Sequence, residues 1–121
     1  MIKLVYCIRR REAVPSAEFH RYWLHEHGPL VASLAGDLSA VRYVQSHTVA
    51  PDLNEMLRQS RGLKAPYDGI TEVWWKDEDS FRAALASEQG QAAARALIED
   101  EARFIDLARS RVFLTREHEI F

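Results

Sequence analysis

The order of strand-like and helix-like patterns constrains the fold of this chain more than any other feature. Segments rich in β-branched and aromatic residues predict four strands, and amphipathic or acid-capped segments between them predict helices. The expected strands cover residues 2–8, 40–50, 70–76 and 111–116, and the expected helices begin near Ser16, Asp77 and Ser87. This β-α-β-β-α-β order predicts an α+β, ferredoxin-like plait, with a four-stranded antiparallel sheet and both helical regions on one face.

The opposite face of such a sheet has no helices to cover it. Left bare, it would expose a large apolar patch, so the pattern predicts a homodimer in which sheet faces sheet. The chain has 121 residues, which is enough for one core and too few for two. We therefore expect a single domain over residues 1–121.

Charge and cysteine content exclude several classes of partner. The net charge of -2 offers no electrostatic basis for binding nucleic acid or an anionic membrane, and no apolar run approaches the ~20 residues that span a bilayer. The apolar opening precedes its positive charges, unlike a signal peptide. One cysteine, Cys7, permits no internal disulfide. We expect a cytoplasmic protein.

Residues 18–31 place one histidine, His27, on an apolar helical stripe. Ser16 is the expected N-cap of this helix. Gly28 and Pro29 follow His27, and a proline there must kink or end the helix, because it lacks an N–H and clashes with the preceding turn. His27 is therefore predicted to face the interior beside carbonyls that the kink frees. The stripe itself consists of Phe19, Tyr22, Trp23, Leu30 and Val31.

His27 is the leading catalytic candidate. Imidazole titrates near neutral pH, so a partly buried one can take and return a proton during enolisation, cyclisation or dehydration. The structural alternative is a histidine in the last turn of its helix that donates to a free carbonyl and is favoured by the helix dipole.

A polar row is expected on one face of the second strand. Alternation places Tyr43, Gln45 and His47 together. Such a row can line a pocket, with His47 or Tyr43 donating to a substrate oxygen and Gln45 orienting it. Equally, it can form cross-strand hydrogen bonds on a face that is turned to solvent or to a dimer partner.

Glu72 stands in the middle of an apolar strand. A carboxylate there is costly unless it is paired or has a raised pKa. It can orient His47 or act as a base itself; the alternative is a structural pair with an arginine such as Arg42. Asp100 and Glu101 pose a similar question, since both fall near an apolar helical stripe and one of them is expected to be partly buried.

Aromatic residues offer walls for a substrate pocket. Tyr22, Trp23 and Trp74 are the candidates for substrate contact, and core or interface packing is the alternative for at least some of them. Residues 51–66 form a long polar connection with a possible short helix inside it. Connections of this length often cover a functional opening.

No pattern selects a metal or a cofactor. His20, His25 and His27 lack the i,i+4 spacing that places two imidazoles on one helical face, and no cluster of Cys, His or Asp supplements them. A phosphate-binding glycine loop and a nucleophile motif are also missing from the sequence. We expect neither metal nor cofactor.

Several motifs together resemble the EthD-domain family, over nearly the whole chain. They are the opening MIKLVYCIRRR, Tyr22-Trp23 with His27-Gly28-Pro29-Leu30, residues 42–47, Tyr67-Asp68-Gly69 with residues 72–75, and Asp100-Glu101 with Arg103-Phe104. The resemblance implies a dimeric α/β barrel with a pocket between the sheet and the helices of each subunit. Relatives in that superfamily include cofactor-independent oxygenases, isomerases, and cyclases or dehydratases that act on aromatic polyketides, and some relatives bind haem.

Two functional hypotheses follow. The first is a small cofactor-free enzyme, an oxidoreductase, isomerase or lyase, that acts on an apolar aromatic or ketone-bearing molecule. His27 is its acid/base group, assisted by His47, Tyr43 and Glu72. The alternative is a non-catalytic dimer that binds a hydrophobic metabolite. A purely structural dimer would have no cavity near His27.

Overall fold

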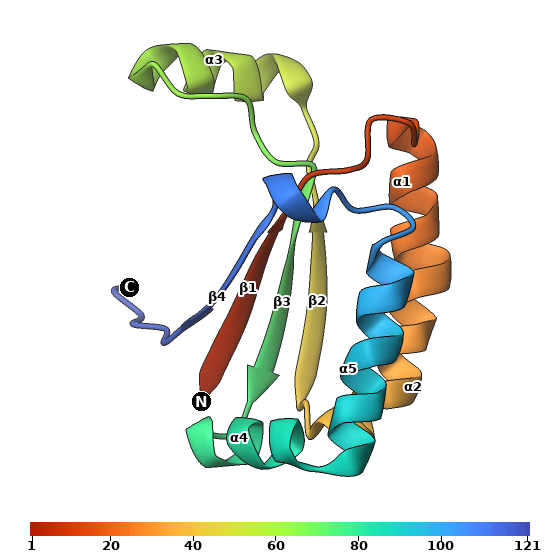
Figure 1. Ribbon diagram of the computed structural model, residues 1–121. Helices are drawn as coiled ribbons and strands as arrows, with labels where there is room; N and C mark the ends of the chain where they lie inside the picture. Colours follow the sequence, from red (N-terminus) through yellow and green to blue (C-terminus); the bar gives the residue numbers. More distant parts are fainter.

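The computed structural model describes residues 1–121 and contains one four-stranded antiparallel sheet with most of its helices on one face (Figure 1). The strands lie in the order β2-β3-β1-β4, which confirms the ferredoxin-like α+β plait. The strands are β1 (Ile2–Ile8), β2 (Arg42–His47), β3 (Gly69–Trp75) and β4 (Arg111–Thr115). The helices are α1 (Ser16–Tyr22), α2 (Gly28–Leu38), α3 (Pro51–Arg61), α4 (Glu78–Ala86) and α5 (Glu88–Glu101), with a π-helical turn at Trp23–His27 and a 3₁₀ turn at Leu107–Arg109.

The first helical region continues through Gly28 and Pro29. α1 runs into the π-helical turn and then directly into α2, where Pro29 lies in the first turn. The Gly28 N–H donates to the Trp23 carbonyl, an i→i+5 bond that widens the helix here. Proline is tolerated because a first-turn position needs no N–H. The predicted irregularity is therefore a π-helical turn just before Gly28.

Both ends of this region differ from expectation. Pro15 occupies the N-cap position and no side chain caps the helix, so the predicted Ser16 cap is wrong. The Phe19 N–H finds the Pro15 carbonyl instead, at 2.9 Å. A helix break is also expected at Gly36, where glycine follows the apolar run, but α2 continues past it and ends at Leu38, with Ser39 in the left-handed region (φ 56°).

The starts of α4 and α5 follow the sequence signals. Asp77 Oδ1 accepts from the Ser80 N–H at 2.8 Å, and Ser87 Oγ accepts from the Gly90 N–H at 2.9 Å. Each side chain satisfies an N–H that the first helical turn leaves unpaired. The expected starts of these two helices are confirmed.

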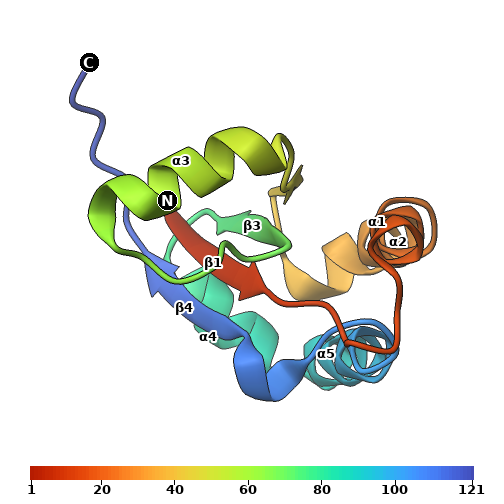
Figure 2. The ribbon, with the colours of Figure 1, turned by 90° about the horizontal axis from the view of Figure 1, so that it is seen from above.

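The polar connection between β2 and β3 contains α3, which has no buried residue. Seen from above, α3 lies on the side of the sheet away from α1, α2 and α5 (Figure 2). The expectation that this connection covers a functional opening is not met within one chain, since no α3 residue lines the main cavity. None of the helices combines the length and apolar character that crossing a bilayer requires.

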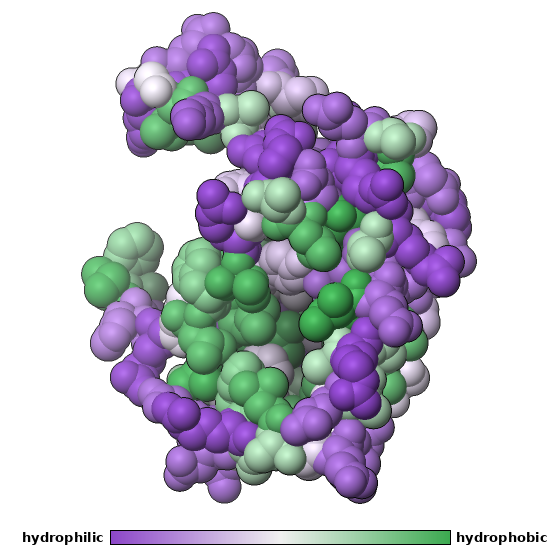
Figure 3. Space-filling view, viewed as in Figure 1, coloured by the Kyte–Doolittle hydropathy of each residue, from purple (hydrophilic) through white to green (hydrophobic).

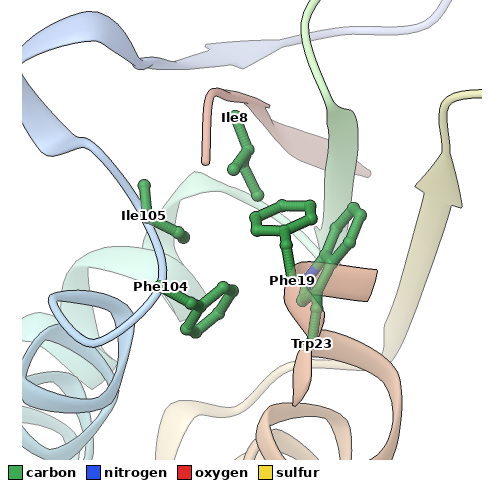
Figure 4. Packing of buried hydrophobic residues seen from close by; sticks show 5 residues of the cluster. All are labelled: Ile8, Phe19, Trp23, Phe104 and Ile105. Carbon is green, nitrogen blue, oxygen red and sulfur yellow. The ribbon is translucent and has the colours of Figure 1, made fainter. Parts of the chain in front are cut away.

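The buried core is small and lies at one end of the sheet. It joins Ile8 of β1, Phe19 of α1, Trp23 of the π-helical turn, and Phe104 and Ile105 after α5 (Figure 4). Phe19 and Trp23 are fully buried, and the Phe19 ring contacts the rings of both Trp23 and Phe104. This cluster fixes the π-helical turn against the strands.

Gly69 begins β3 where the Trp23 ring lies against the backbone. A Cβ at this position would lie 2.4 Å from the Trp23 ring and 2.8 Å from the Ser46 carbonyl. Only glycine leaves room for the indole here. The close approach of Trp23 to the sheet thus depends on one residue without a side chain.

Candidate functional site

A cavity of about 470 Å³ lies between the sheet and the helices. Its lining is mostly apolar, and the space-filling view shows apolar surface around a hollow between β1 and β4 on one side and α5 on the other (Figure 3). The volume suits a small organic molecule. Its polar lining residues are His27, Thr71 and Glu101, together with the hydroxyl-bearing Tyr6 and Tyr43.

His27 lies at this cavity as the end of a hydrogen-bonded chain. Its side chain is buried, and its Nδ1 lies 2.7 Å from Asp100 Oδ2. The Tyr22 hydroxyl donates to Asp100 Oδ1 at 2.5 Å. Because a carboxylate only accepts, Nδ1 carries the proton and Nε2 presents its lone pair. Nε2 has no partner in the protein and is not a fully buried atom, so a molecule in the cavity can reach it.

The surroundings of His27 hold it as a neutral base. Burial lowers the pKa of His27, and the hydrogen bond and charge of Asp100 oppose that shift only in part. Burial and the Asp100 carboxylate raise the pKa of Tyr22 to about 12, so this phenol stays protonated and continues to donate. A histidine oriented by a carboxylate is a general arrangement for proton transfer.

Glu101 is a second ionisable group at the cavity. It follows Asp100 at the end of α5, but its side chain lines the cavity instead of binding His27. Burial is the largest effect and raises the pKa of Glu101 to about 7; the neighbouring Asp100 charge adds to this, and the Tyr6 hydroxyl opposes it. Burial and the Glu101 charge in turn raise the pKa of Tyr6.

The polar row of β2 faces the helices, but only its first member lines the cavity. Gln45 Nε2 donates to the Tyr43 hydroxyl at 2.9 Å and to the Trp23 carbonyl at 2.7 Å. Gln45 Oε1 lies 2.8 Å from His47 Nε2, and His47 Nδ1 lies 2.7 Å from His20 Nδ1. Gln45 therefore positions Tyr43, whereas His47 stacks on Trp23, with ring centroids 4.2 Å apart, outside the cavity lining.

Tyr43 contributes a hydroxyl group to the cavity from β2. Burial raises the pKa of Tyr43, and hydrogen bonding from Gln45, Thr71 and Trp23 opposes that rise. The Trp23 indole Nε1 is buried and lacks a partner of ordinary hydrogen-bond geometry. Because its pKa is raised, Tyr43 remains a neutral phenol that can donate to a ligand oxygen.

Glu72 and Trp74 lie on the opposite face of the sheet, as the register shows. Glu72 pairs with Val44 on β2, whereas His47 pairs with Gly69, so the pleat points Glu72 away from His47. Glu72 forms an ion pair with Lys3 at 2.6 Å, and Trp74 Nε1 donates to Glu117 at 2.6 Å. The expected roles of Glu72 toward His47 and of Trp74 in the pocket are not met.

The predicted alternative for Glu72 named the wrong cation. Arg42 does not pair with Glu72; it lies over the Trp74 ring, 4.5 Å from its centroid. Lys3 reaches Glu72 from β1, the other neighbour of β3. Trp75 follows Trp74 on β3 and therefore lies on the opposite face of the sheet, where it lines the cavity.

The sequence reasoning did not identify Asp100, Tyr6 or Thr71 as members of the site. The one available signal was that Asp100 and Glu101 fall near the helical stripe of α5, and both are in fact half-buried. Nothing in the sequence indicated which of the two meets His27, because the partners are 73 residues apart. No three His, Cys, Asp or Glu side chains gather as a metal site would require.

Several solved structures share this fold. An ethyl tert-butyl ether d (EthD) family protein from Bacillus halodurans is 15% identical with a TM-score of 0.65, covering 98% of this chain and 99% of that chain. SnoaB, a cofactor-independent oxygenase from Streptomyces nogalater, is 18% identical with a TM-score of 0.55, covering 98% and 93%. A dimeric ferredoxin-like protein of unknown function from Thermobifida fusca is 16% identical with a TM-score of 0.57, covering 96% and 90%.

At these identities the likeness establishes the fold alone. Among curated proteins, none matches the sequence. The family model of the EthD domain, however, matches residues 11–108. That range contains His27, Asp100 and Glu101, and the match confirms the resemblance seen in the motifs: the chain belongs to the EthD domain family.

Proposed function

We propose that this protein is a cofactor-free enzyme that transfers protons on an apolar aromatic or ketone-bearing small molecule, with His27 as its acid/base group. The observation that carries the proposal is the neutral His27 held by Asp100, with a free Nε2 at an apolar cavity of about 470 Å³. A base in an apolar cavity meets a substrate with little competing water.

The roles of the neighbouring residues follow from their contacts. Asp100 fixes the tautomer of His27 and stabilises the imidazolium that forms when Nε2 takes a proton. Tyr22 holds Asp100 in place. Tyr43, positioned by Gln45, donates a hydrogen bond to a substrate oxygen, while Trp23 and the aliphatic lining contact the apolar skeleton.

The structural neighbours support a small-molecule role. SnoaB, whose fold this chain shares, is a cofactor-independent oxygenase. The second candidate function is binding without turnover of a hydrophobic metabolite. The observation that favours it is the predominance of apolar side chains over polar ones in the cavity lining.

The test compares the wild type with His27→Gln and with His25→Gln as a matched control. His25 is exposed and lies in the same π-helical turn, so its substitution changes one imidazole without entering the cavity. Quenching of tryptophan fluorescence by a panel of naphthols and aryl ketones reports binding, because Trp23 and Trp75 line the cavity. Mass spectrometry of the same mixtures reports product.

Saturable quenching with a product that His27→Gln abolishes and His25→Gln retains would support the enzyme. Saturable quenching by the wild type without product would favour the binding protein. A product formed equally by wild type and His27→Gln would rule out His27 as the acid/base group.

We also infer that the protein is a homodimer joined through the bare face of its sheet. Apolar side chains there include Val5, Val44, Ile70 and Phe113, of which Ile70 and Phe113 are 37% and 51% exposed. The Thermobifida fusca neighbour is described as dimeric. Covering this face removes apolar surface from water.

A further inference from the structure

The geometry points to Glu101 as the acid of the cavity, which donates a proton to the carbonyl oxygen of an enolisable ketone while His27 takes a proton from the adjacent carbon. The inference rests on the proposed function and deepens it: it names as the substrate class a ketone whose α-carbon is attached to an aromatic ring, which makes the hydrogen on that carbon acidic.

The position of Glu101 carries this assignment. Its side chain and His27 line the same cavity. Asp100 binds His27 Nδ1, and Glu101 is the next residue of α5. A base and an acid thus line one apolar cavity. Moving a proton from a carbon and delivering another to an oxygen of the same ligand requires such a pair.

The contacts of Glu101 explain why it can serve as a donor. The titratable groups that face it are Tyr6 on β1, Tyr43 on β2 and Asp100 on α5, with His27 lining the same cavity. None of these carries a positive charge while His27 is neutral. A buried carboxyl without a cation keeps its proton to higher pH than an exposed one, so Glu101 is still partly protonated at neutral pH.

The proposed step balances without a co-reactant. His27 Nε2 takes the proton from the α-carbon, the C–H electron pair becomes the C=C bond of the enol, and the carbonyl π pair moves to oxygen. That oxygen takes the proton of Glu101. The products are the enol, an imidazolium at His27 and a carboxylate at Glu101. The reverse step returns one proton to carbon and one to Glu101, so neither residue is consumed.

The experiment uses 2-tetralone as the probe, with wild type, Glu101→Gln, His27→Gln and the control Glu99→Gln. Glu99 is exposed on the same helix, so its substitution makes the same charge change outside the cavity. Fluorescence titration at pH 6.5 and 8.5 measures affinity. Nuclear magnetic resonance in D₂O measures incorporation of deuterium at the α-carbon.

We expect wild type and Glu99→Gln to bind 2-tetralone at least about tenfold more weakly at pH 8.5 than at pH 6.5, as Glu101 loses its proton. Glu101→Gln should bind equally at both pH values, because its amide donates throughout, and should exchange deuterium at least about tenfold more slowly than wild type at pH 6.5. His27→Gln should keep the pH-dependent binding and lose exchange.

Three results would overturn the assignment: no binding of 2-tetralone by the wild type, pH-independent binding by the wild type, or wild-type pH dependence retained in Glu101→Gln. Exchange that survives His27→Gln, alongside pH-dependent binding that Glu101→Gln abolishes, would refute His27 as the base but uphold Glu101 as the donor. The two proposals therefore fail separately.

Discussion

At the scale of single residues, the contact between Asp100 and His27 decides whether the imidazole is a base. Asp100→Asn replaces an acceptor by a group that can donate to Nδ1, which favours the tautomer with its proton on Nε2. We expect turnover to fall by about 10⁴-fold, the loss typical of a catalytic histidine held in the wrong tautomer by an Asp→Asn change. Long-range ¹⁵N–¹H spectra should show the proton on Nδ1 in the wild type and on Nε2 in the variant.

Tyr22→Phe is the control for this change, because it removes a hydrogen bond to Asp100 but leaves the carboxylate to accept from His27. It should keep the proton on Nδ1. Finding the proton on Nε2 in the wild type would contradict the assignment of His27 as a base.

Glu101 makes the stability of the protein depend on pH. Its pKa is raised in the folded state from 4.5 to about 7, so folding favours the protonated form, and this stability is present below pH 4.5 and lost as the pH rises through 7. Glu101→Gln should therefore gain up to roughly 3 kcal/mol in unfolding free energy over wild type between pH 4.5 and pH 8. Urea denaturation of both proteins at the two pH values measures the difference.

His27 makes stability depend on pH in the opposite direction. Its pKa is lowered in the folded state, so its contribution is present above about 6.5 and lost as the pH falls through the lowered pKa. Both proteins contain His27, and its effect cancels in their comparison. Equal differences between wild type and Glu101→Gln at both pH values would show that Glu101 titrates normally.

At the scale of elements, the packing of the π-helical turn against β3 leaves no room for a side chain at position 69. Gly69→Ala places a Cβ 2.4 Å from the Trp23 ring, and we expect a loss of about 1–3 kcal/mol in unfolding free energy. Gly36→Ala is the matched contrast, because a Cβ there meets nothing within 4 Å and alanine favours a helix by up to about 1 kcal/mol. Urea titration should give opposite signs; a neutral Gly69→Ala would contradict the packing described.

The elements also show where sequence reasoning succeeds. α4 and α5 begin at Asp77 and Ser87 as expected, and each of these side chains caps its helix, because a cap depends on residues three positions away. Ser16 does not cap α1, since Pro15 takes the N-cap position and its carbonyl meets the first turn. The kink expected at Pro29 becomes a π-helical turn because Trp23 and Phe19 pack in the core on one side while Gln45 binds the Trp23 carbonyl on the other.

At the scale of the whole molecule, the bare sheet face determines assembly. Phe113→Asp places a charge on that face and should shift a dimer toward monomer at micromolar concentration, as measured by light scattering. Leu24→Asp is the control, because Leu24 is equally exposed, at 50% against 51%, but lies in the π-helical turn. A wild-type monomer, or an equal effect of both substitutions, would contradict a dimer through the sheet.

Local pattern in the sequence determined the order of strands and helices, the face that each strand residue shares with its neighbours, and the place of His27 on an apolar helical stripe. These properties depend on residues within a turn or a pleat of one another. Only the tertiary structure decided that Asp100 meets His27, that Glu101 faces the cavity, and that Glu72 turns to Lys3 on the opposite face. Those outcomes depend on how strands pair and helices pack across distances of 69 and 73 residues, which periodicity within a segment does not specify.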